Sequence, residues 1–192
     1  MSKNSKRIED LLVELKNTSE MMVDLAYSSL MYESKDIAAR VIEMEEEMDK
    51  LHREFELSVL ESGKERTSKE KLALIRIGLA TERIADAATL VADIASRGPK
   101  THSIFKIAIE ESEKTILCTT IAKNSIMTDK SLGELGLEDD IGIKIIAIFR
   151  NVKWIYNPSD SFKLNAGDEI IARGYSRGRA KLLSLTNPKD FS

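Results

Sequence analysis

The sequence predicts an all-α bundle of three long helices followed by a small α+β domain. Residues 5–97 contain no proline and only two glycines, Gly63 and Gly78, and their apolar residues recur at helical spacing. The C-terminal half instead has short β-branched and apolar runs separated by turn signals. We expect a helical bundle over residues 1–98, a connector helix over 99–112 and the α+β domain over 113–192.

Two amphipathic helices open the bundle. The first runs over about residues 5–31 and breaks at YESKD, where Ser34 or Asp36 is a candidate cap for the second. The second ends near Gly63, the residue type that often follows the last turn of a helix. The turns that join these helices to the third are short, which predicts antiparallel packing.

The third helix covers about residues 68–96, with Thr67 or Ser68 as its cap, and is apolar on two opposite faces. We therefore expect it to be buried on both sides. At 100° per residue, Glu82 and Asp86 share a stripe with leucines and isoleucines. Buried carboxylates must be protonated, paired with a cation or bound to a metal. The acidic pair is therefore a candidate cation site.

The second half predicts a sheet with short helices. The strand candidates are TILCTTIA, GIKIIAIFR, VKWIYNP and DEIIARGY. SLGELGL is expected to form a short helix between the first two strands, and SRGRAKLLSL a terminal helix. Arg150 and Asn151 are expected to form one turn, and NAGD at 165–168 another. About 80 residues make a small core, so we expect self-association to stabilise this domain.

Composition and charge exclude several classes of protein. The chain of 192 residues is 42% apolar and 32% charged, with a net charge of −3. These figures describe a soluble globular protein without an electrostatic footprint for nucleic acid, so we expect no nucleic-acid partner. No apolar segment is long enough to span a bilayer, and the N-terminus lacks the apolar core of a signal peptide. We expect a cytoplasmic protein, peripheral to the membrane if it serves a membrane process.

Catalytic motifs are missing from the sequence. The chain has only two histidines, and neither lies near a nucleophile-elbow pattern. There is no GxxxxGK[ST] phosphate loop and no GxGxxG after a strand. We therefore expect no enzymatic activity.

The helical half resembles one known family. ERIAD, residues 82–86, resembles the ERIGD signature of PhoU-like helical domains, a family linked to the regulation of phosphate uptake. VIEMEEEMDKLHREFE, residues 41–56, resembles the second diagnostic helix of that family. The resemblance covers about residues 5–97, one three-helix repeat where full PhoU proteins have two. It departs from the family at Ala85, usually glycine, and at Ala87, often histidine.

Carboxylates four residues apart beside an imidazole suit a divalent or iron-type metal. With the PhoU resemblance, they predict a metal site. Its candidate ligands are Glu45, Asp49, His52, Glu82 and Asp86. Two other interpretations stay open. Glu45 and Asp49 lie in a charged run that commonly faces water, and nearby arginines are able to neutralise the acids in ordinary ion pairs. Those arginines are Arg40, Arg53, Arg76 and Arg83.

The C-terminal half resembles a TrkA-C domain, also known as the C-terminal lobe of RCK regulators of potassium transport. The similarity runs over residues 131–174 and includes Arg150 after an apolar strand, the Asn157–Pro158 turn and the Gly167–Asp168 pair. The nucleotide-binding lobe that precedes TrkA-C in many RCK proteins is replaced by the helical half. Nearly the whole chain thus resembles archaeal and bacterial PhoU-like/TrkA-C two-domain proteins.

This second resemblance implies a ligand-responsive, non-catalytic regulator of potassium or other cation transport. It implies a homodimer acting on a cation channel or transporter at the membrane. Some TrkA-C relatives bind cyclic di-AMP at the dimer interface, contacting it with the strand equivalent to IIAIFR. In this chain we expect apolar side chains to cover the bases and a guanidinium to pair with a phosphate. Carried over by position, the contacts are Ile145, Ile146, Arg150, Asn157 and Pro158. The isoleucines also suit a plain strand core. The alternative function is a metal-binding PhoU-like adaptor in phosphate-uptake regulation.

Overall fold

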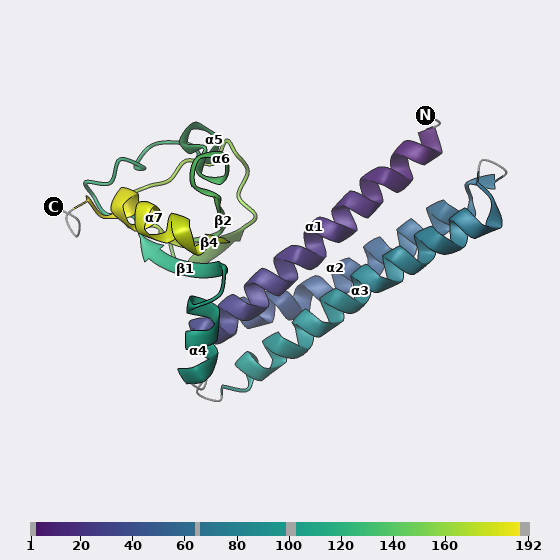
Figure 1. Ribbon diagram of the computed structural model, residues 1–192, viewed down its shortest axis with the longest axis horizontal. Helices are drawn as coiled ribbons and strands as arrows, with labels where there is room; N and C mark the ends of the chain where they lie inside the picture. Colours follow the sequence, from purple (N-terminus) through teal and green to yellow (C-terminus); the bar gives the residue numbers. More distant parts are fainter. Residues whose placement is uncertain (1–2, 64–65, 99–102, 189–192) are drawn as a thin grey trace. The chain divides into compact units, whose positions relative to one another are not determined.

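The structure is a computed structural model that describes residues 3–63, 66–98 and 103–188. The chain divides into two compact units, residues 1–101 and 102–192. Long helices form the first unit, whereas the second combines a sheet with short helices (Figure 1). The predicted fold class is therefore confirmed. Among the described residues, no helix is both long enough and apolar enough to cross a membrane.

The first unit contains α1 (Lys3–Met31), α2 (Lys35–Leu60) and α3 (Ser68–Ser96), and each helix packs against the other two. The Ser34 side chain caps α2 by accepting a hydrogen bond from the Ile37 amide. Thr67 caps α3 in a capping box with Glu70. Both caps fix the helix starts at positions that the sequence predicts.

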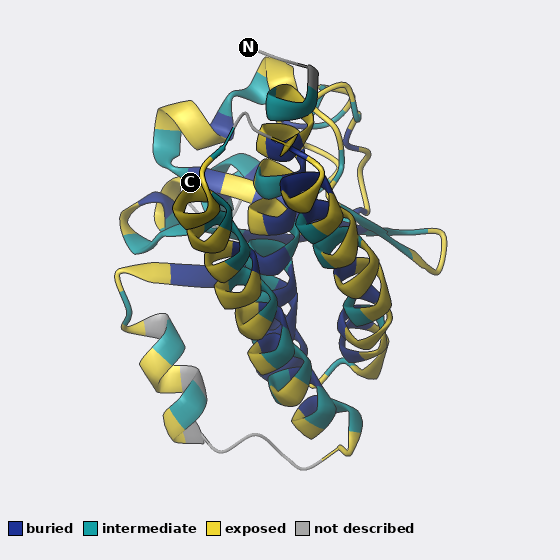
Figure 2. Ribbon diagram, turned by 90° about the vertical axis from the view of Figure 1, so that its right-hand side faces the viewer, coloured by how far each residue is buried: buried dark blue, intermediate teal, exposed yellow. Residues whose placement is uncertain are grey.

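The core of the first unit is asymmetric. α1 and α2 contribute large side chains such as Leu15, Met22, Met48 and Phe55, whereas the buried residues of α3 are Gly78 and four alanines. A Cβ at Gly78 would lie 2.7 Å from the Phe55 ring, so glycine is required for this close approach. Buried residues lie on the inner sides of the long helices and exposed ones on the outer sides (Figure 2).

The expectation that α3 is buried on both sides is wrong. Its small residues face α1 and α2, and its larger apolar residues stay exposed on the opposite side. These exposed residues are Leu72, Ile77, Leu79, Ile84, Leu90 and Ile94. In a three-helix unit each helix has only two neighbours, so the outer apolar stripe has no neighbouring helix within the unit.

The second unit is built on a four-stranded antiparallel sheet of order β1-β4-β2-β3. The strands are β1 (Lys114–Thr120), β2 (Ile143–Arg150), β3 (Lys153–Tyr156) and β4 (Glu169–Tyr175). The other elements are α4 (Ser103–Glu110), α5 (Leu132–Leu135), α6 (Leu137–Ile141), η2 (Ser176–Gly178) and α7 (Arg179–Thr186). The expected connector helix corresponds to α4, while residues 99–102, where it was expected to begin, lie outside the described residues.

The β2–β3 turn lies one residue later than the sequence predicts. Asn151 and Val152 form it, with φ angles of 52° and 64°. A two-residue hairpin loop favours positive φ at both central residues because this backbone matches the twist of the strands. Behind the hairpin, Ile143, Ile145 and Ile148 of β2 join one core cluster with residues of β1, β4 and α7.

Candidate functional site

A pocket of about 230 Å³ opens in the second unit beside the start of β2. Its wall comes from α5, α6, β2 and the segment after β3. The lining residues are Leu132, Leu137, Glu138, Ile143, Lys144, Ile145, Pro158 and Asp160. Ile145 and Pro158 are two of the five ligand residues expected from the TrkA-C resemblance.

Local hydrogen bonds hold the pocket wall in place. The Asn157 amide, at a φ of 46°, donates to the Ile146 carbonyl at 2.9 Å, which brings Pro158 beside β2. The Gly133 amide donates to the Asp160 carbonyl at 2.8 Å, which ties α5 to the segment after β3. A capping box of Ser131 and Glu134 starts α5, and hydrogen bonds from the Ser131 backbone and side chain lower the pKa of Glu134.

The pocket has an apolar wall and a few charged groups. Leu132, Leu137, Ile143, Ile145 and Pro158 supply the apolar surface. One cation, Lys144, and two carboxylates, Glu138 and Asp160, are the charged residues that line it. An apolar surface with few polar groups is typical of small-molecule sites, where the polar groups fix the orientation of the ligand.

Arg150 does not line this pocket. Its Nε and Nη2 atoms donate to the two carboxylate oxygens of Asp168 at 2.7 and 2.6 Å. Nη2 also donates to the Lys163 carbonyl at 2.7 Å, and the guanidinium lies 4.8 Å from the centre of the Phe162 ring. The hydrogen bonds to Asp168 raise the pKa of Arg150. A phosphate would bind the Nε–Nη2 edge of the Arg150 guanidinium. In this structure the Asp168 carboxylate, from the same unit, already occupies that edge.

Two further predicted ligand residues lie outside the pocket lining. Ile146 is 4% exposed and sits where the β2–β4 register shifts between Ile145 and Ala147. Asn157 is exposed in the turn after β3. The sequence reasoning missed Lys144, Glu138 and Asp160. Lys144 is the second residue of a strand that is otherwise apolar up to Arg150, and this is a signal that the sequence offers. Glu138 and Asp160 become neighbours of β2 only through the fold.

The predicted metal residues lie on α2 and α3. Burial raises the pKa of Glu82 most, and the charges of Asp86 and Asp49 raise it further, while His52 and Arg83 lower it. These groups are therefore electrostatic neighbours. The His52 Nε2 atom is buried and lies 3.7 Å from a Glu56 oxygen.

No metal-binding arrangement supports this prediction in the part of the chain that the structure describes. No group of three or more His, Cys, Asp or Glu residues there is placed to hold a metal ion. The metal site, its divalent or iron-type occupant and the adaptor function built on it stay predictions.

Comparison with known proteins identifies both halves. Residues 12–95 match the PhoU domain, and residues 119–187 match the TrkA-C domain. Among curated proteins, no sequence matches this chain.

Similar solved structures belong to RCK proteins. The RCK_C domain dimer of S. agalactiae BusR in complex with c-di-AMP is 26% identical, with a TM-score of 0.36, over 38% of this chain and 96% of that one. The RCK C domain of the potassium transport protein KtrA in complex with c-di-AMP is 25% identical, with a TM-score of 0.34, over 42% of this chain and 92% of that one.

The expectation of no nucleic-acid partner is contradicted. Another similar structure is S. agalactiae BusR in complex with its busA-promoter DNA, which is 20% identical with a TM-score of 0.36. The similarity extends over 73% of this chain and 67% of the BusR chain. The expectation rested on net charge alone, and net charge averages over a surface, so it does not exclude a nucleic-acid partner.

Proposed function

We propose that this chain, a PhoU domain followed by a TrkA-C domain, is a non-catalytic, ligand-responsive regulator of potassium or other cation transport. The observation that carries this proposal is the pocket beside β2, because it lies within the segment that matches the TrkA-C domain. Its mixture of apolar wall and isolated charges suits a small effector more than a macromolecule.

The effector that we propose is cyclic di-AMP. The pocket volume of about 230 Å³ is below the roughly 300–1,000 Å³ of sites that enclose a whole drug-sized ligand. It suits one adenine, and a ligand with two identical halves then occupies the pockets of two copies. Ile145 and Pro158 cover the base, and Lys144 pairs with a phosphate.

In this proposal, the two carboxylates at the pocket wall bind the adenine base. Glu138 and Asp160 are acceptors at the pocket wall, and the exocyclic amine of adenine is a donor. Arg150 has a different role in this proposal. Its bidentate pair with Asp168 stabilises the hairpin that leads to Pro158, so its contribution to binding is indirect.

Titration calorimetry of the full chain with cyclic di-AMP tests the proposal. We expect micromolar binding, weakened about 10- to 100-fold by Lys144→Ala, because a charge-assisted hydrogen bond contributes roughly 1.5–3 kcal/mol. Lys153→Ala is the matched control, since Lys153 is an exposed lysine on the neighbouring strand β3 and does not line the pocket. No binding at high micromolar cyclic di-AMP, or equal losses in the two variants, would refute this effector site.

A further inference from the structure

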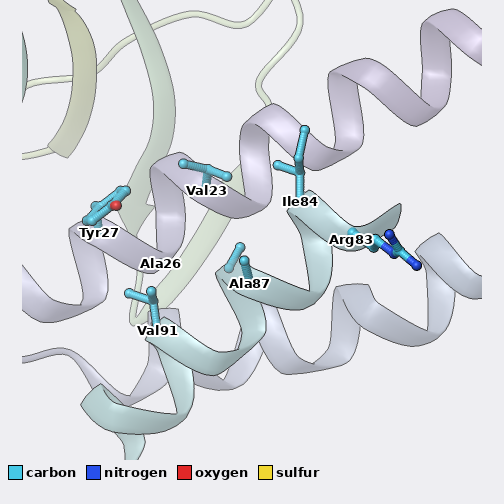
Figure 3. A pocket seen from close by; sticks show the side chains of 8 residues that line it. Val23, Ala26, Tyr27, Arg83, Ile84, Ala87 and Val91 are labelled. Carbon is cyan, nitrogen blue, oxygen red and sulfur yellow. The ribbon is translucent and has the colours of Figure 1, made fainter. Parts of the chain in front are cut away.

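Two cavities of the chain differ in the polar groups that line them. The cavity between α1 and α3, of about 270 Å³, is lined mainly by alanines, valines and an isoleucine, and Arg83 is the one charged residue in its lining (Figure 3). The pocket beside β2 is smaller, but three of its lining residues are charged. A site with several polar groups depends on how firmly those groups are held. The support of Asp160, one of the three, therefore matters for binding at this pocket.

The loop that carries Asp160 is anchored on the first turn of α5. We name residues 157–162, which follow β3, the strap. The Leu132 amide donates to the Phe162 carbonyl at 3.0 Å, and the Gly133 amide donates to the Asp160 carbonyl at 2.8 Å. The first amides of a helix have no acceptor within the helix, so two carbonyls of the strap satisfy two of these donors.

Gly133 is a point of close approach between α5 and the strap. A Cβ at this position would lie 3.3 Å from the Cβ atom of Asp160 and 3.3 Å from its carbonyl oxygen. These distances are shorter than ordinary van der Waals contact, so a side chain here would displace Asp160 by a few tenths of an ångström. Gly133 lies inside a helix and its φ is not positive. The contact with the strap, and not an unusual backbone angle, therefore explains the glycine.

We propose that Gly133 is a positioning residue for effector binding, because its missing side chain lets the α5 amide hold Asp160 at the pocket wall. This role rests on the proposed function, since the ligand is the effector assigned to the pocket beside β2. Gly133 is not one of the residues that line the pocket, so it acts on the ligand through Asp160. Helix propensity alone favours alanine at this position, and the strap opposes it.

Calorimetry of the full-chain variant Gly133→Ala with cyclic di-AMP tests this role. We expect binding about threefold to tenfold weaker than in the wild type, because a site loses affinity when its polar groups move by about half an ångström. Urea denaturation of the same variant is expected to show no matching loss of stability, since alanine favours the helix. An unchanged affinity would overturn the proposal.

A double-mutant cycle separates positioning from general damage to the fold. Asp160→Ala removes the carboxylate and keeps the backbone carbonyl. In that background we expect Gly133→Ala to cause less than about a twofold further loss of affinity, because the two residues act as one unit. Glu138→Ala is the matched control, since Glu138 is the other acid of the pocket and lies outside the strap. There the full loss is expected, and equal losses in all backgrounds would mean that Gly133 has only a structural role.

Hydrogen exchange of the residue-133 amide gives a readout without ligand. In the wild type this amide donates to the Asp160 carbonyl. In Gly133→Ala the crowded contact is expected to lower its protection factor at least about threefold. An unchanged protection factor would mean that the strap is not displaced and would overturn the proposal. A wild type that does not bind cyclic di-AMP would instead refute the effector site, and the positioning role with it, whatever the exchange result.

Discussion

Asp168 is 2% exposed and forms a bidentate pair with Arg150, and its Oδ2 atom also accepts a hydrogen bond from the Asn165 amide at 2.7 Å. Removing one partner of a buried pair leaves the other charge without compensation. We expect Asp168→Asn to lower the free energy of unfolding by about 3 kcal/mol. Urea denaturation followed by circular dichroism measures this loss.

An exposed ion pair serves as the control for that variant. Asp93 of α3 and Arg97, the residue after the end of this helix, form an i,i+4 pair at 2.5 Å, and Arg97 is largely exposed. Asp93→Asn is expected to change stability far less than Asp168→Asn does, because solvent screens the pair. Similar losses in the two variants would mean that the buried pair has no special structural role.

Arg150 also shows where residue-level prediction ends. An arginine after an apolar strand requires an anionic or carbonyl partner, and the sequence predicts that much. Asp168 is 18 positions away, and only the pairing of β2 with β4 brings the two together. A phosphate and this carboxylate satisfy the same guanidinium, so the residue type alone does not distinguish them.

At the scale of the helix, the N-cap of α2 offers a local test. The Ser34 hydroxyl accepts a hydrogen bond from the Ile37 amide at 3.4 Å. We expect Ser34→Ala to destabilise the protein by about 1 kcal/mol and Ser34→Gly by only a few tenths, since glycine leaves the amide accessible to water. Thermal unfolding of both variants checks the order. A glycine variant less stable than the alanine variant would contradict the capping role.

The elements themselves were predicted well because their signals are local. Caps at Ser34 and Thr67, helical spacing and β-branched runs depend on neighbouring residues, and the structure has the elements close to where the sequence places them. The environment of α3 was not predicted. A helical wheel identifies an apolar stripe, but a stripe buried within one chain and a stripe left exposed have the same pattern.

The two units expose surfaces of different chemistry. In the second unit, a small pocket with Lys144 at its edge suits a phosphorylated ligand. In the first unit, the large apolar residues on the outer side of α3 stay exposed, because the two neighbouring helices cover only its inner side.

The stability of the whole molecule should depend on pH through Glu82. In the folded chain its pKa lies above the ordinary value of 4.5, raised first by burial and then by Asp86 and Asp49, and lowered by His52 and Arg83. Between pH 4.5 and the raised pKa, the folded state therefore binds more protons than the unfolded state. The free energy of unfolding falls as the pH rises through this window and levels off above the raised pKa.

Urea denaturation of the full chain between pH 4.5 and 7 measures this dependence. Glu82→Gln replaces the carboxyl by a neutral amide of similar size, so it is the necessary comparison. In that variant we expect a flatter profile and a greater stability at pH 7 than in the wild type, because no charge has to form in this environment. A variant profile that parallels the wild type would assign the pH dependence to another group.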